Sequence, residues 1–463
     1  MKVAKSLNGQ SIAIIGLGAS GKAAARLAFE KGGEVYVSEM RTDKEACHGA
    51  SQLRNIGIEV ELGPHVEERI ASAGTVVISP GIPHDTGIVR KLADNGISTI
   101  SEPEFAFRFF EGPLIAVTGT NGKTTTAMLI TQLLKEDGQD VALGGNVGGG
   151  MAPPASELAL VENVPSWYVL ELSSFQLSGV VDLKPTIGVF TNLAPDHLDR
   201  YDSVGAYYRD KGNIFVNADE QSCWVLNGGD YELASLAQDV PGERFYFSRS
   251  SAGSQAAYLD GDMVTVKLAE SQSSLIGVDA IPLLGKHNVE NVLAAALTAK
   301  LAGASSRSIS DGIGKFSGLP HRTEKVVQHN EITWVNDSKA TNVTATISGI
   351  ESFDENLLVL LGGQDKGEDF SRLIESLKAN NSKALVFGES GNRLHDQLKA
   401  DVRVRYIPGS FEDVIEFARG WADPGDTVLL SPACPSFDMF ANYQERGDYF
   451  CQLVMKFVEV TDD

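Results

Sequence analysis

The string TGTNGKTT, residues 118–125, has the composition of a loop that binds nucleotide phosphates. It follows an apolar run and precedes a helical run at 127–135. Glycines permit a tight turn, and backbone N–H groups at a helix start hold phosphate oxygens. Lys123 would then reach the outer phosphates and the Thr124 hydroxyl would bind Mg²⁺. Val117 stands where the strict GxxxxGK[ST] pattern has glycine, so the loop is shorter than the common form, and a Gly-rich turn without a ligand is the alternative.

A second glycine-rich string, GLGASG at 16–21, also lies between a strand and a helix. Glu39 closes the next apolar run, near the spacing at which an acid binds ribose in NAD-binding domains. The pattern is only moderately specific, because any diphosphate-sugar ligand can use the same turn and helix start. NAD and a nucleotide-sugar diphosphate therefore both remain open.

Acidic and polar residues follow three further apolar runs. Glu171 ends the run YVLEL, where a carboxylate would bind Mg²⁺ beside a phosphate; a helix-capping or surface acid is the alternative. The loop NLAPDHLDR, residues 192–200, gathers Asp196, His197, Asp199 and an arginine. The polar loops at 336–342 and 361–366, taken alone, are typical of solvated turns.

Short β-branched runs alternate with helical stretches, which predicts parallel α/β sheets with ligands at the carboxyl ends of the strands. They form three series, so we expect three consecutive α/β domains, 1–111, 112–318 and 319–463, with breaks near Gly112-Pro113 and Gly318-Leu319-Pro320. The expected helix at 291–301 is rich in Ala and Leu. The expected strands are 12–15, 35–37, 76–78, 97–100; 114–117, 141–143, 168–172, 187–190, 224–226; and 357–361, 385–387, 404–407, 428–430.

The composition bounds the class of protein. The chain has 463 residues, of which 43% are hydrophobic, so it can bury several cores. A formal net charge of -22 argues against a broad basic surface for nucleic acid. Four scattered cysteines show no metal-ligand spacing. The N-terminus lacks a signal-peptide core and no apolar run reaches about 18 residues, which favours a cytoplasmic protein without membrane insertion.

Taken together, the strings resemble the Mur ligase family over essentially the whole chain. Seven motifs occur in the order of that family, and such a series is highly specific. They are TGTNGKTT at 118–125, GGNVG at 144–148, LELSSFQL at 170–177, DHLDRY at 196–201, LPHR at 319–322, NDSKATN at 336–342 and LSPACPSFD at 430–438.

The resemblance implies a fold of three domains: an N-terminal Rossmann-like domain that binds UDP, a central domain like a P-loop ATPase, and a C-terminal Rossmann-like domain. Among the family's branches, the strings look most like the one that adds D-glutamate. ATP would phosphorylate the carboxylate of UDP-N-acetylmuramoyl-L-alanine, and the D-glutamate amine would attack the acyl phosphate. This would be a cytoplasmic step of peptidoglycan precursor synthesis.

The resemblance also implies roles for individual residues. Lys123, Glu171, His197 and Lys211 would be catalytic, with Lys211 carbamylated, and two Mg²⁺ ions would be held by Thr124, Glu171, His197 and Lys211. ATP would contact Gly119, Thr120, Asn121, Gly122, Lys123, Thr124, Thr125, Asn288, Asn291, Arg322, Asp337 and Lys339. The UDP-linked substrate would contact Gly18, Ala19, Ser20, Glu39, Arg41, Ser79, Gly81, Asn146, Ser173 and Gln176. D-Glutamate would contact His197, Thr341, Lys366, Ser436 and Tyr443.

Two departures from the family pattern lie in the expected acceptor pocket, at Pro435 and at Gln364-Asp365. Three rival functions follow from the same sequence. The chain could be a ligase of the family that adds L-alanine, a diamino acid, a dipeptide or folate polyglutamate. It could be an NAD-linked oxidoreductase that uses residues 16–21, or a nucleotide-gated binding protein without catalysis.

Overall fold

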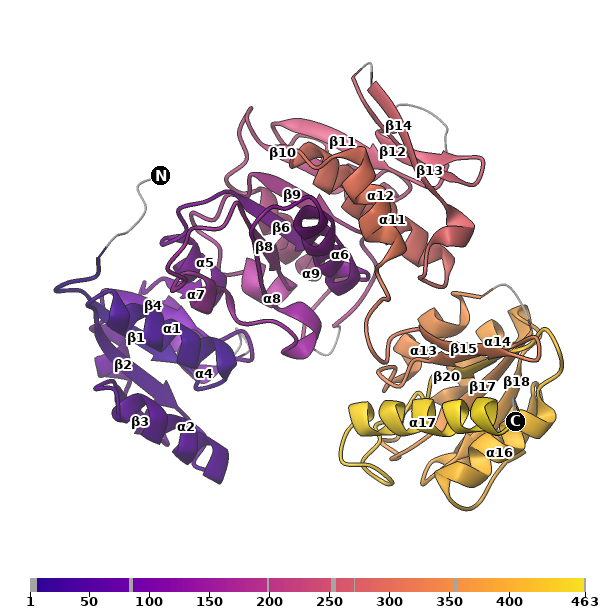
Figure 1. Ribbon diagram of the computed structural model, residues 1–463. Helices are drawn as coiled ribbons and strands as arrows, with labels where there is room; N and C mark the ends of the chain where they lie inside the picture. The colour runs from indigo at the N-terminus through magenta and orange to yellow at the C-terminus, as the bar shows by residue number, and fades with distance from the viewer. Residues whose placement is uncertain are drawn as a thin grey trace. The chain divides into compact units, whose positions relative to one another are not determined.

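The computed structural model describes residues 6–82, 86–197, 200–250, 255–269, 271–353 and 356–461. These residues form three α/β sheets, as the sequence predicts (Figure 1). The chain divides into two compact units, Met1–Val278 with Glu290–Gly314 and Asp279–Val289 with Lys315–Asp463. The first two sheets lie in the first unit, so the expected divisions after residues 111 and 318 stay predictions.

The N-terminal sheet is parallel, with the strand order β3-β2-β1-β4-β5. Ile12 and Ile14 of β1 pack in one core while Ala13 and Ile15 pack in another, because helices cover both faces of the sheet. The strands are β1 (Ser11–Ile15), β2 (Glu34–Glu39), β3 (Glu59–Leu62), β4 (Thr75–Ile78) and β5 (Thr99–Ser101). The helices are α1 (Ala19–Glu30), α2 (Lys44–Arg54), α3 (Glu67–Ala71), α4 (Gly87–Asp94) and α5 (Glu102–Phe107).

The central sheet has the order β14-β13-β12-β11-β10-β9-β6-β8-β7. It is parallel from β7 to β12, and β13 and β14 extend it in antiparallel fashion. Its strands are β6 (Leu114–Thr118), β7 (Val141–Gly145), β8 (Trp167–Glu171), β9 (Ile187–Phe190), β10 (Cys223–Asn227), β11 (Glu243–Phe247), β12 (Ala257–Asp260), β13 (Met263–Leu268) and β14 (Ser271–Gly277). The helices are α6 (Lys123–Glu136), α7 (Ala155–Leu158), α8 (Ser174–Leu177), α9 (Val204–Gly212), α10 (Tyr231–Leu236), α11 (Lys286–Leu301) and α12 (Ser306–Gly314). Short 3₁₀ turns are η1 (Val147–Gly149), η2 (Asn213–Phe215) and η3 (Val278–Ala280).

The sheet of the second unit has the order β15-β16-β20-β17-β18-β19, and only the β15–β16 pair within it is antiparallel. Alternate residues of β17 fill two cores, with Leu357 and Val359 on one face and Leu358 and Leu360 on the other. The strands are β15 (Glu324–His329), β16 (Ile332–Asn336), β17 (Leu357–Gly362), β18 (Lys383–Phe387), β19 (Arg403–Tyr406) and β20 (Thr427–Leu430). The helices are α13 (Val343–Ile350), η4 (Phe370–Leu373), α14 (Ile374–Ala379), α15 (Gly391–Leu398), α16 (Phe411–Trp421) and α17 (Tyr443–Thr461).

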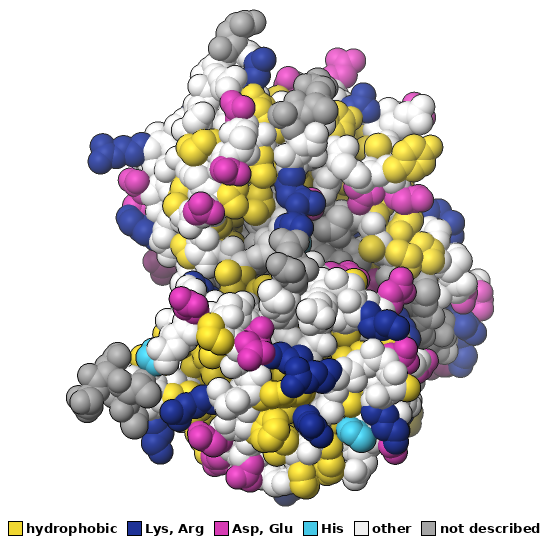
Figure 2. Space-filling model, turned by 90° about the vertical axis from the view of Figure 1, so that its right-hand side faces the viewer, with side chains coloured by type: hydrophobic (Ala, Val, Ile, Leu, Met, Phe, Trp, Pro, Cys, Tyr) yellow, Lys and Arg dark blue, Asp and Glu magenta, His cyan; other side chains and the backbone are white. Residues whose placement is uncertain are grey.

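The surface carries charge of both signs. Figure 2 shows lysine and arginine side chains interspersed with aspartate and glutamate over one face of the molecule. Among the helices in the described part of the chain, none has the length and apolar character needed to cross a membrane.

Candidate active site

The phosphate loop runs from β6 into α6, which begins at Lys123 directly after Gly122. Gly119 and Gly122 have φ angles of 142° and 78°, a region in which L side chains are strained. A Cβ on Gly119 would collide with Thr191, and one on Gly122 with Asn291. Both glycines are therefore required by the conformation of the loop and by the close approach of its neighbours.

The segment after β9 holds the phosphate loop in place. The N–H groups of Thr120 and Asn121 donate to the carbonyl and side-chain oxygens of Asn192, both at 2.9 Å. The hydroxyl of Thr120 exchanges hydrogen bonds with the backbone of Ala194, at 3.0 and 3.1 Å. The 192–194 stretch of the NLAPDHLDR string thus braces the loop.

The first turn of α6 carries Lys123, Thr124 and Thr125. Thr124 and Thr125 are buried, and the Lys123 ammonium donates to the carbonyl oxygen of Thr120 at 2.8 Å. The first N–H groups of a helix have no partner within that helix, and its dipole favours negative charge there. The arrangement suits the phosphates of a nucleotide, as the string predicts.

Glu171 ends β8, which lies between β6 and β7 in the sheet. Its register partners are Val117 on the phosphate-loop strand and Gly145 on β7. The side chain is buried, and the Glu171 carbonyl oxygen accepts from the N–H of Asn146 at 2.9 Å. The sheet thus places the acid at the same edge as the phosphate loop.

Lys211, near the end of α9, is almost fully buried. Its local spacing in the sequence did not indicate the role that the family resemblance implies for it. Its ammonium donates to the carbonyl oxygen of Gly119 at 2.6 Å and lies 4.9 Å from the centre of the Tyr207 ring. Burial and the nearby Lys123 ammonium lower the pKa of Lys211 well below that of a free lysine, while Asp196 and Glu171 act in the opposite direction.

His197 lies on the loop before α9 with a φ angle of 54°. Its ring is 5.1 Å from the Phe175 ring and 6.0 Å from the Tyr207 ring, centre to centre. Its Nε2 lies 3.7 Å from an oxygen of Asp196. Lys211 and His197 therefore both approach Tyr207, one buried and one about half exposed. Asp199 lies outside the described residues.

In the part of the chain that the structure describes, acids, histidines and cysteines alone do not assemble a metal-binding group. Within the described ranges, no group of three or more such side chains could hold a metal ion. The candidate ligands Thr124 and Lys211 are of other residue types.

The glycine-rich turn of the N-terminal sheet brings Gly18 close to Ser79. Gly16 has a φ of 98°, Gly18 caps the start of α1, and a Cβ on Gly18 would lie 3.7 Å from the Ser79 hydroxyl. Ala19 and Ser20 form the first turn of α1, and Gly81 follows Ser79 at the end of β4. The expected residues of the UDP site in this sheet thus share its carboxyl edge.

Glu39 binds the same turn from the neighbouring strand. Its carboxylate accepts from the N–H groups of Leu17 at 2.8 Å and Arg41 at 2.9 Å, and Arg41 Nε lies 3.4 Å away. Although burial opposes the shift, the backbone hydrogen bonds from Arg41 and Leu17 hold the pKa of Glu39 below its usual range. Glu39 is thus engaged by the protein itself.

The remaining residues expected at the UDP substrate lie on the central sheet. Ser173 and Gln176 form a capping box at the start of α8, in which each side chain accepts from the backbone N–H of the other, at 3.3 and 3.0 Å. Asn146 is exposed just after β7. A small crevice nearby is lined by Ser79, Ser101 and Phe175, among others.

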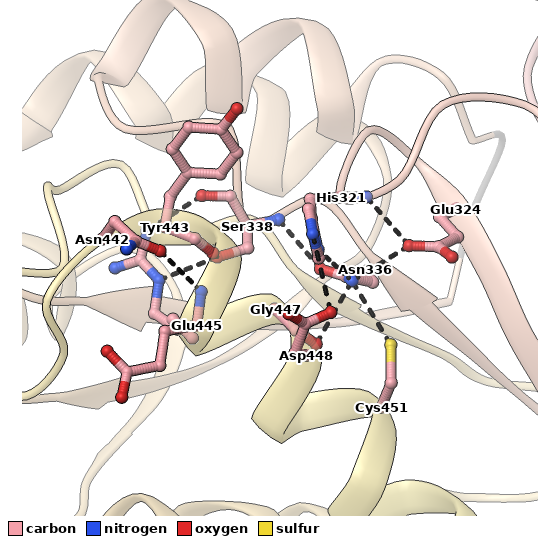
Figure 3. A network of polar contacts seen from close by, with 11 residues as sticks. His321, Glu324, Asn336, Ser338, Asn442, Tyr443, Glu445, Gly447, Asp448 and Cys451 are labelled. Carbon is pink, nitrogen blue, oxygen red and sulfur yellow. Dashed lines mark hydrogen bonds and ion pairs between the residues drawn. The ribbon is translucent and has the colours of Figure 1, made fainter. Parts of the chain in front are cut away.

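In the second unit, Asn336 is the centre of a buried polar network (Figure 3). Its side-chain amide nitrogen lies 3.0 Å from His321 Nδ1, 3.1 Å from a Glu324 oxygen, and 3.3 Å from both the Gly447 carbonyl oxygen and Cys451 Sγ. The LPHR and NDSKATN motifs are therefore packed together on α17.

Asp337 is buried and both of its oxygens have protein partners. One accepts from the Thr323 N–H at 3.2 Å and the other from the Ser431 hydroxyl at 2.8 Å. Burial raises the pKa of Asp337 to about 7. Lys339 Nζ lies 5.7 Å from the Tyr443 ring, and Arg322 is partly exposed.

The two asparagines of α11 have separate environments. Asn288 donates from its side chain to the Leu284 carbonyl at 2.7 Å. Asn291 accepts from the Thr126 hydroxyl at 3.3 Å and packs on the phosphate loop at Gly122. Asn291, expected to contact ATP, thus lies at the phosphate loop itself.

The expected D-glutamate residues differ in exposure. Lys366 is exposed, Thr341 and Tyr443 are partly exposed, and Ser436 is buried. Among the described residues, the Ser436 hydroxyl has no hydrogen-bond partner, which is a feature that a ligand could satisfy. At the position of the Pro435 departure, the Pro435 carbonyl accepts from the Gln364 N–H at 2.8 Å.

The sequence did not indicate a role for Arg446 at the site, because an arginine in the first turn of a helix is typical of a solvated face. It is fully buried on α17. Its guanidinium donates to the Ser338 hydroxyl at 3.0 Å, the Ser338 carbonyl at 2.9 Å and the Cys434 carbonyl at 3.1 Å. Burial lowers its pKa to about 10. It joins the NDSKATN and LSPACPSFD motifs.

Family models match three consecutive parts of the chain. The N-terminal domain of MurD-like Mur ligases matches residues 10–101, the Mur ligase middle domain matches 117–299, and the Mur ligase glutamate ligase domain matches 321–434.

Curated relatives align over nearly the full length. A UDP-N-acetylmuramoylalanine--D-glutamate ligase from Alkaliphilus metalliredigens is 34% identical over 97% of this chain and 98% of its own. One from Geobacillus kaustophilus is 37% identical over 98% and 100%.

Solved structures share the fold at low identity. MurF from Acinetobacter baumannii covers 86% of this chain and 88% of its own with 13% identity and a TM-score of 0.57. UDP-N-acetylmuramate-alanine ligase MurC from Thermotoga maritima covers 97% and 100% with 17% identity and a TM-score of 0.54. With the three family models in sequence and full-length relatives above 30% identity, the chain belongs to the Mur ligase family.

Proposed function

We propose that the chain is an ATP-dependent ligase that joins D-glutamate to UDP-N-acetylmuramoyl-L-alanine, in the cytoplasmic assembly of peptidoglycan precursors. The observation that carries the proposal is the buried Lys211. Its ammonium donates a hydrogen bond to Gly119 of the phosphate loop, and the charge of Glu171 favours the protonated form of the amine. The full-length relatives named for this reaction support the choice of substrates.

The phosphate loop would position ATP for transfer of its terminal phosphoryl group to the carboxylate of the UDP-linked substrate. Phosphoryl transfer depends mainly on positioning and on neutralising charge. The N-terminal turn of α6 supplies backbone donors, and Lys123 supplies a cation that can turn from the Thr120 carbonyl to an outer phosphate. The product of this step would be an acyl phosphate and ADP.

Mg²⁺ fits the donors at this edge of the sheet. The Thr124 hydroxyl and the Glu171 carboxylate are oxygen ligands of the kind that Mg²⁺ prefers, and both are buried beside the phosphate loop. When bound, Mg²⁺ would neutralise charge on the phosphate oxygens. We also propose a second Mg²⁺ ion, which His197 and a carbamylated Lys211 would hold.

Lys211 is suited to carbamylation. Only a neutral amine attacks CO₂, and burial and Lys123 lower the pKa of this amine. The nitrogen forms a bond to carbon and loses a proton, which leaves an anionic carbamate in place of a cation. The carbamate would supply an oxygen ligand where the described His, Asp and Glu side chains form no metal-binding group.

The acceptor would bind through the loops of the second unit. The buried Ser436 hydroxyl, which has no hydrogen-bond partner among the described residues, and the exposed Lys366 ammonium offer a donor and a cation for D-glutamate carboxylates. The D-glutamate nitrogen then attacks the carbonyl carbon of the acyl phosphate. A tetrahedral intermediate expels phosphate and leaves an amide.

Release of phosphate from ATP tests the proposal when each substrate is omitted in turn. Without hydroxylamine, we expect release only when ATP, Mg²⁺, UDP-N-acetylmuramoyl-L-alanine and D-glutamate are all present. Hydroxylamine added without D-glutamate should trap the acyl phosphate as a hydroxamate. Turnover of a nicotinamide cofactor without any need for ATP would instead support the oxidoreductase alternative, and ATP binding without turnover would support a binding protein.

A further inference from the structure

Two glutamates on α5, Glu102 and Glu104, are completely buried, each with 0% exposure. This helix follows β5, the last strand of the N-terminal sheet, and leads into β6 of the central sheet. Burying a carboxylate is costly unless it is paired or hydrogen-bonded. The ligase mechanism above uses neither residue, so their burial calls for another explanation.

Glu104 binds a backbone segment that lies far away in the sequence. One of its oxygens accepts from three successive N–H groups, those of Val181 and Asp182 at 3.1 Å each and that of Leu183 at 2.8 Å. The other oxygen lies 3.5 Å from Arg108 Nε. Successive amides that converge on one oxygen form an anion-binding nest, and here the anion is a side chain of the protein.

Segment 181–183 is held from its other side as well. The side-chain amide of Asn217 donates to the carbonyl oxygens of Val181 at 2.9 Å and Leu183 at 3.1 Å. The side chain of Asn213 donates at 3.1 Å to Leu177, the last residue of α8. Asn213 follows α9 directly, and α9 carries Lys211. The Glu104 contact is thus linked, through segment 181–183, to the end of α8 and to the residues that follow α9.

A second contact joins the two sheets of the first unit at the crevice between them. The Ser101 N–H donates to the Gly179 carbonyl at 3.0 Å, and a Cβ on Gly179 would lie 2.6 Å from the Ser101 nitrogen. Ser79 of the N-terminal sheet and Phe175 of α8 both line the crevice. Phe175 also stacks on Tyr201 and lies 5.1 Å from the His197 ring.

We propose that Glu104 is a positioning residue for the UDP-linked substrate. Its carboxylate fixes segment 181–183 and, through it, sets α8 with Ser173 and Phe175 against Ser79 on the N-terminal sheet. This inference rests on the proposed function, which places the substrate along these residues. The phosphate loop is braced directly by Asn192 and Ala194, so we expect the Glu104 contact to affect nucleotide binding much less than binding of the UDP-linked substrate.

The test compares the Glu104→Gln variant of the full chain with the unaltered chain. Glutamine keeps the shape but removes the charge that the three amides share. We expect amide hydrogen exchange at 181–183 to be about tenfold faster or more, and KM for UDP-N-acetylmuramoyl-L-alanine to rise about tenfold. KM for ATP should stay within about twofold. Glu67→Gln, which alters a glutamate paired with Lys91 on the surface, is the matched control and should change neither.

Asn217→Ala provides a second arm, because it releases the same segment from its opposite side while Glu104 is intact. The same split between the two KM values is expected. Unchanged exchange at 181–183 in Glu104→Gln, or equal increases in both KM values in either variant, would overturn the proposal. An unaltered chain that fails to release phosphate with the named substrates would instead refute the proposed function, and the exchange measurement would still decide whether Glu104 holds the segment.

Discussion

Lys211 on α9 donates a hydrogen bond of 2.6 Å to the carbonyl oxygen of Gly119, so a helix 92 positions further along the chain is tied to the phosphate loop. The contact places a buried amine at the edge of the sheet where Glu171 ends β8. The amine therefore lies beside the loop that is proposed to hold phosphate, where the proposed mechanism places an anionic ligand for the metal. Carbamylation would convert the amine that now donates to Gly119 into that ligand.

Lys123→Ala should lower kcat for phosphate release by about 10²–10³-fold, because a cation that stabilises the transferring phosphoryl group is lost. Binding of UDP-N-acetylmuramoyl-L-alanine, measured by calorimetry, should remain close to that of the unaltered chain, since its expected contacts belong to other loops. Lys135→Ala, at an exposed position on the same helix, is the control. Equal loss of substrate binding and turnover would contradict this division of the site.

Lys211→Ala should lose activity, and short carboxylic acids in the assay should restore part of it by replacing the carbamate oxygens. In the unaltered chain, the lowered pKa of Lys211 leaves more neutral amine at a given pH than a surface lysine has. Added bicarbonate should therefore raise activity most at the acidic end of the active range, where the neutral fraction is smallest. Activity that responds to neither treatment would argue against a carbamate at this position.

Glu102→Gln should change how stability depends on pH. Burial raises the pKa of Glu102 from 4.5 to about 7, so the folded chain binds this proton more tightly than the unfolded chain does. The stabilisation is complete below about pH 4.5 and is lost as pH rises through 7, a change of up to about 3 kcal/mol. Denaturant unfolding should show that Glu102→Gln removes this slope and is the more stable chain at pH 8. Parallel pH profiles for the variant and the unaltered chain would contradict the assignment.

Arg446→Lys should destabilise the second unit by about 2–4 kcal/mol, since lysine lacks the forked donors that reach Ser338 and Cys434 together. KM for D-glutamate should rise as well, because both loops lead to its expected pocket. Denaturant unfolding and steady-state kinetics provide the two measurements. Arg419→Lys on the exposed side of α16 should have little effect on either.

The parallel strands that are buried on both faces could be predicted because they appear as short continuous apolar runs. Strands with one face toward solvent could not be found in this way. In β3, the string EVEL alternates charged and apolar residues, and β15 places Glu324 and Gln328 among its valines. The apolar runs also did not indicate the antiparallel pairs that extend these sheets, at β12–β14 and at β15–β16.

The strand–loop–helix form of the phosphate loop and the place of Glu171 at the end of a strand could be predicted because each depends on neighbours within a few residues. Glu104 and Arg446 could not. Their partners, segment 181–183 and Ser338, lie about 80 to 110 positions away, and in the sequence both residues resemble ordinary charged residues in the first turn of a helix. The burial of Lys211 depends in the same way on contacts between distant segments. The roles assigned to the expected site residues stay predictions.

The most direct test of the proposed reaction is phosphate release with UDP-N-acetylmuramoyl-L-alanine, ATP and Mg²⁺ over a panel of amino acids, with the product identified by mass spectrometry. The panel contains D-glutamate, L-glutamate, L-alanine, a diamino acid and the dipeptide D-alanyl-D-alanine. Among the acceptors of the panel, we expect strong phosphate release only with D-glutamate. The product should be heavier than UDP-N-acetylmuramoyl-L-alanine by one glutamyl residue. Preferred turnover of any other acceptor, or release without a new amide product, would contradict the assignment.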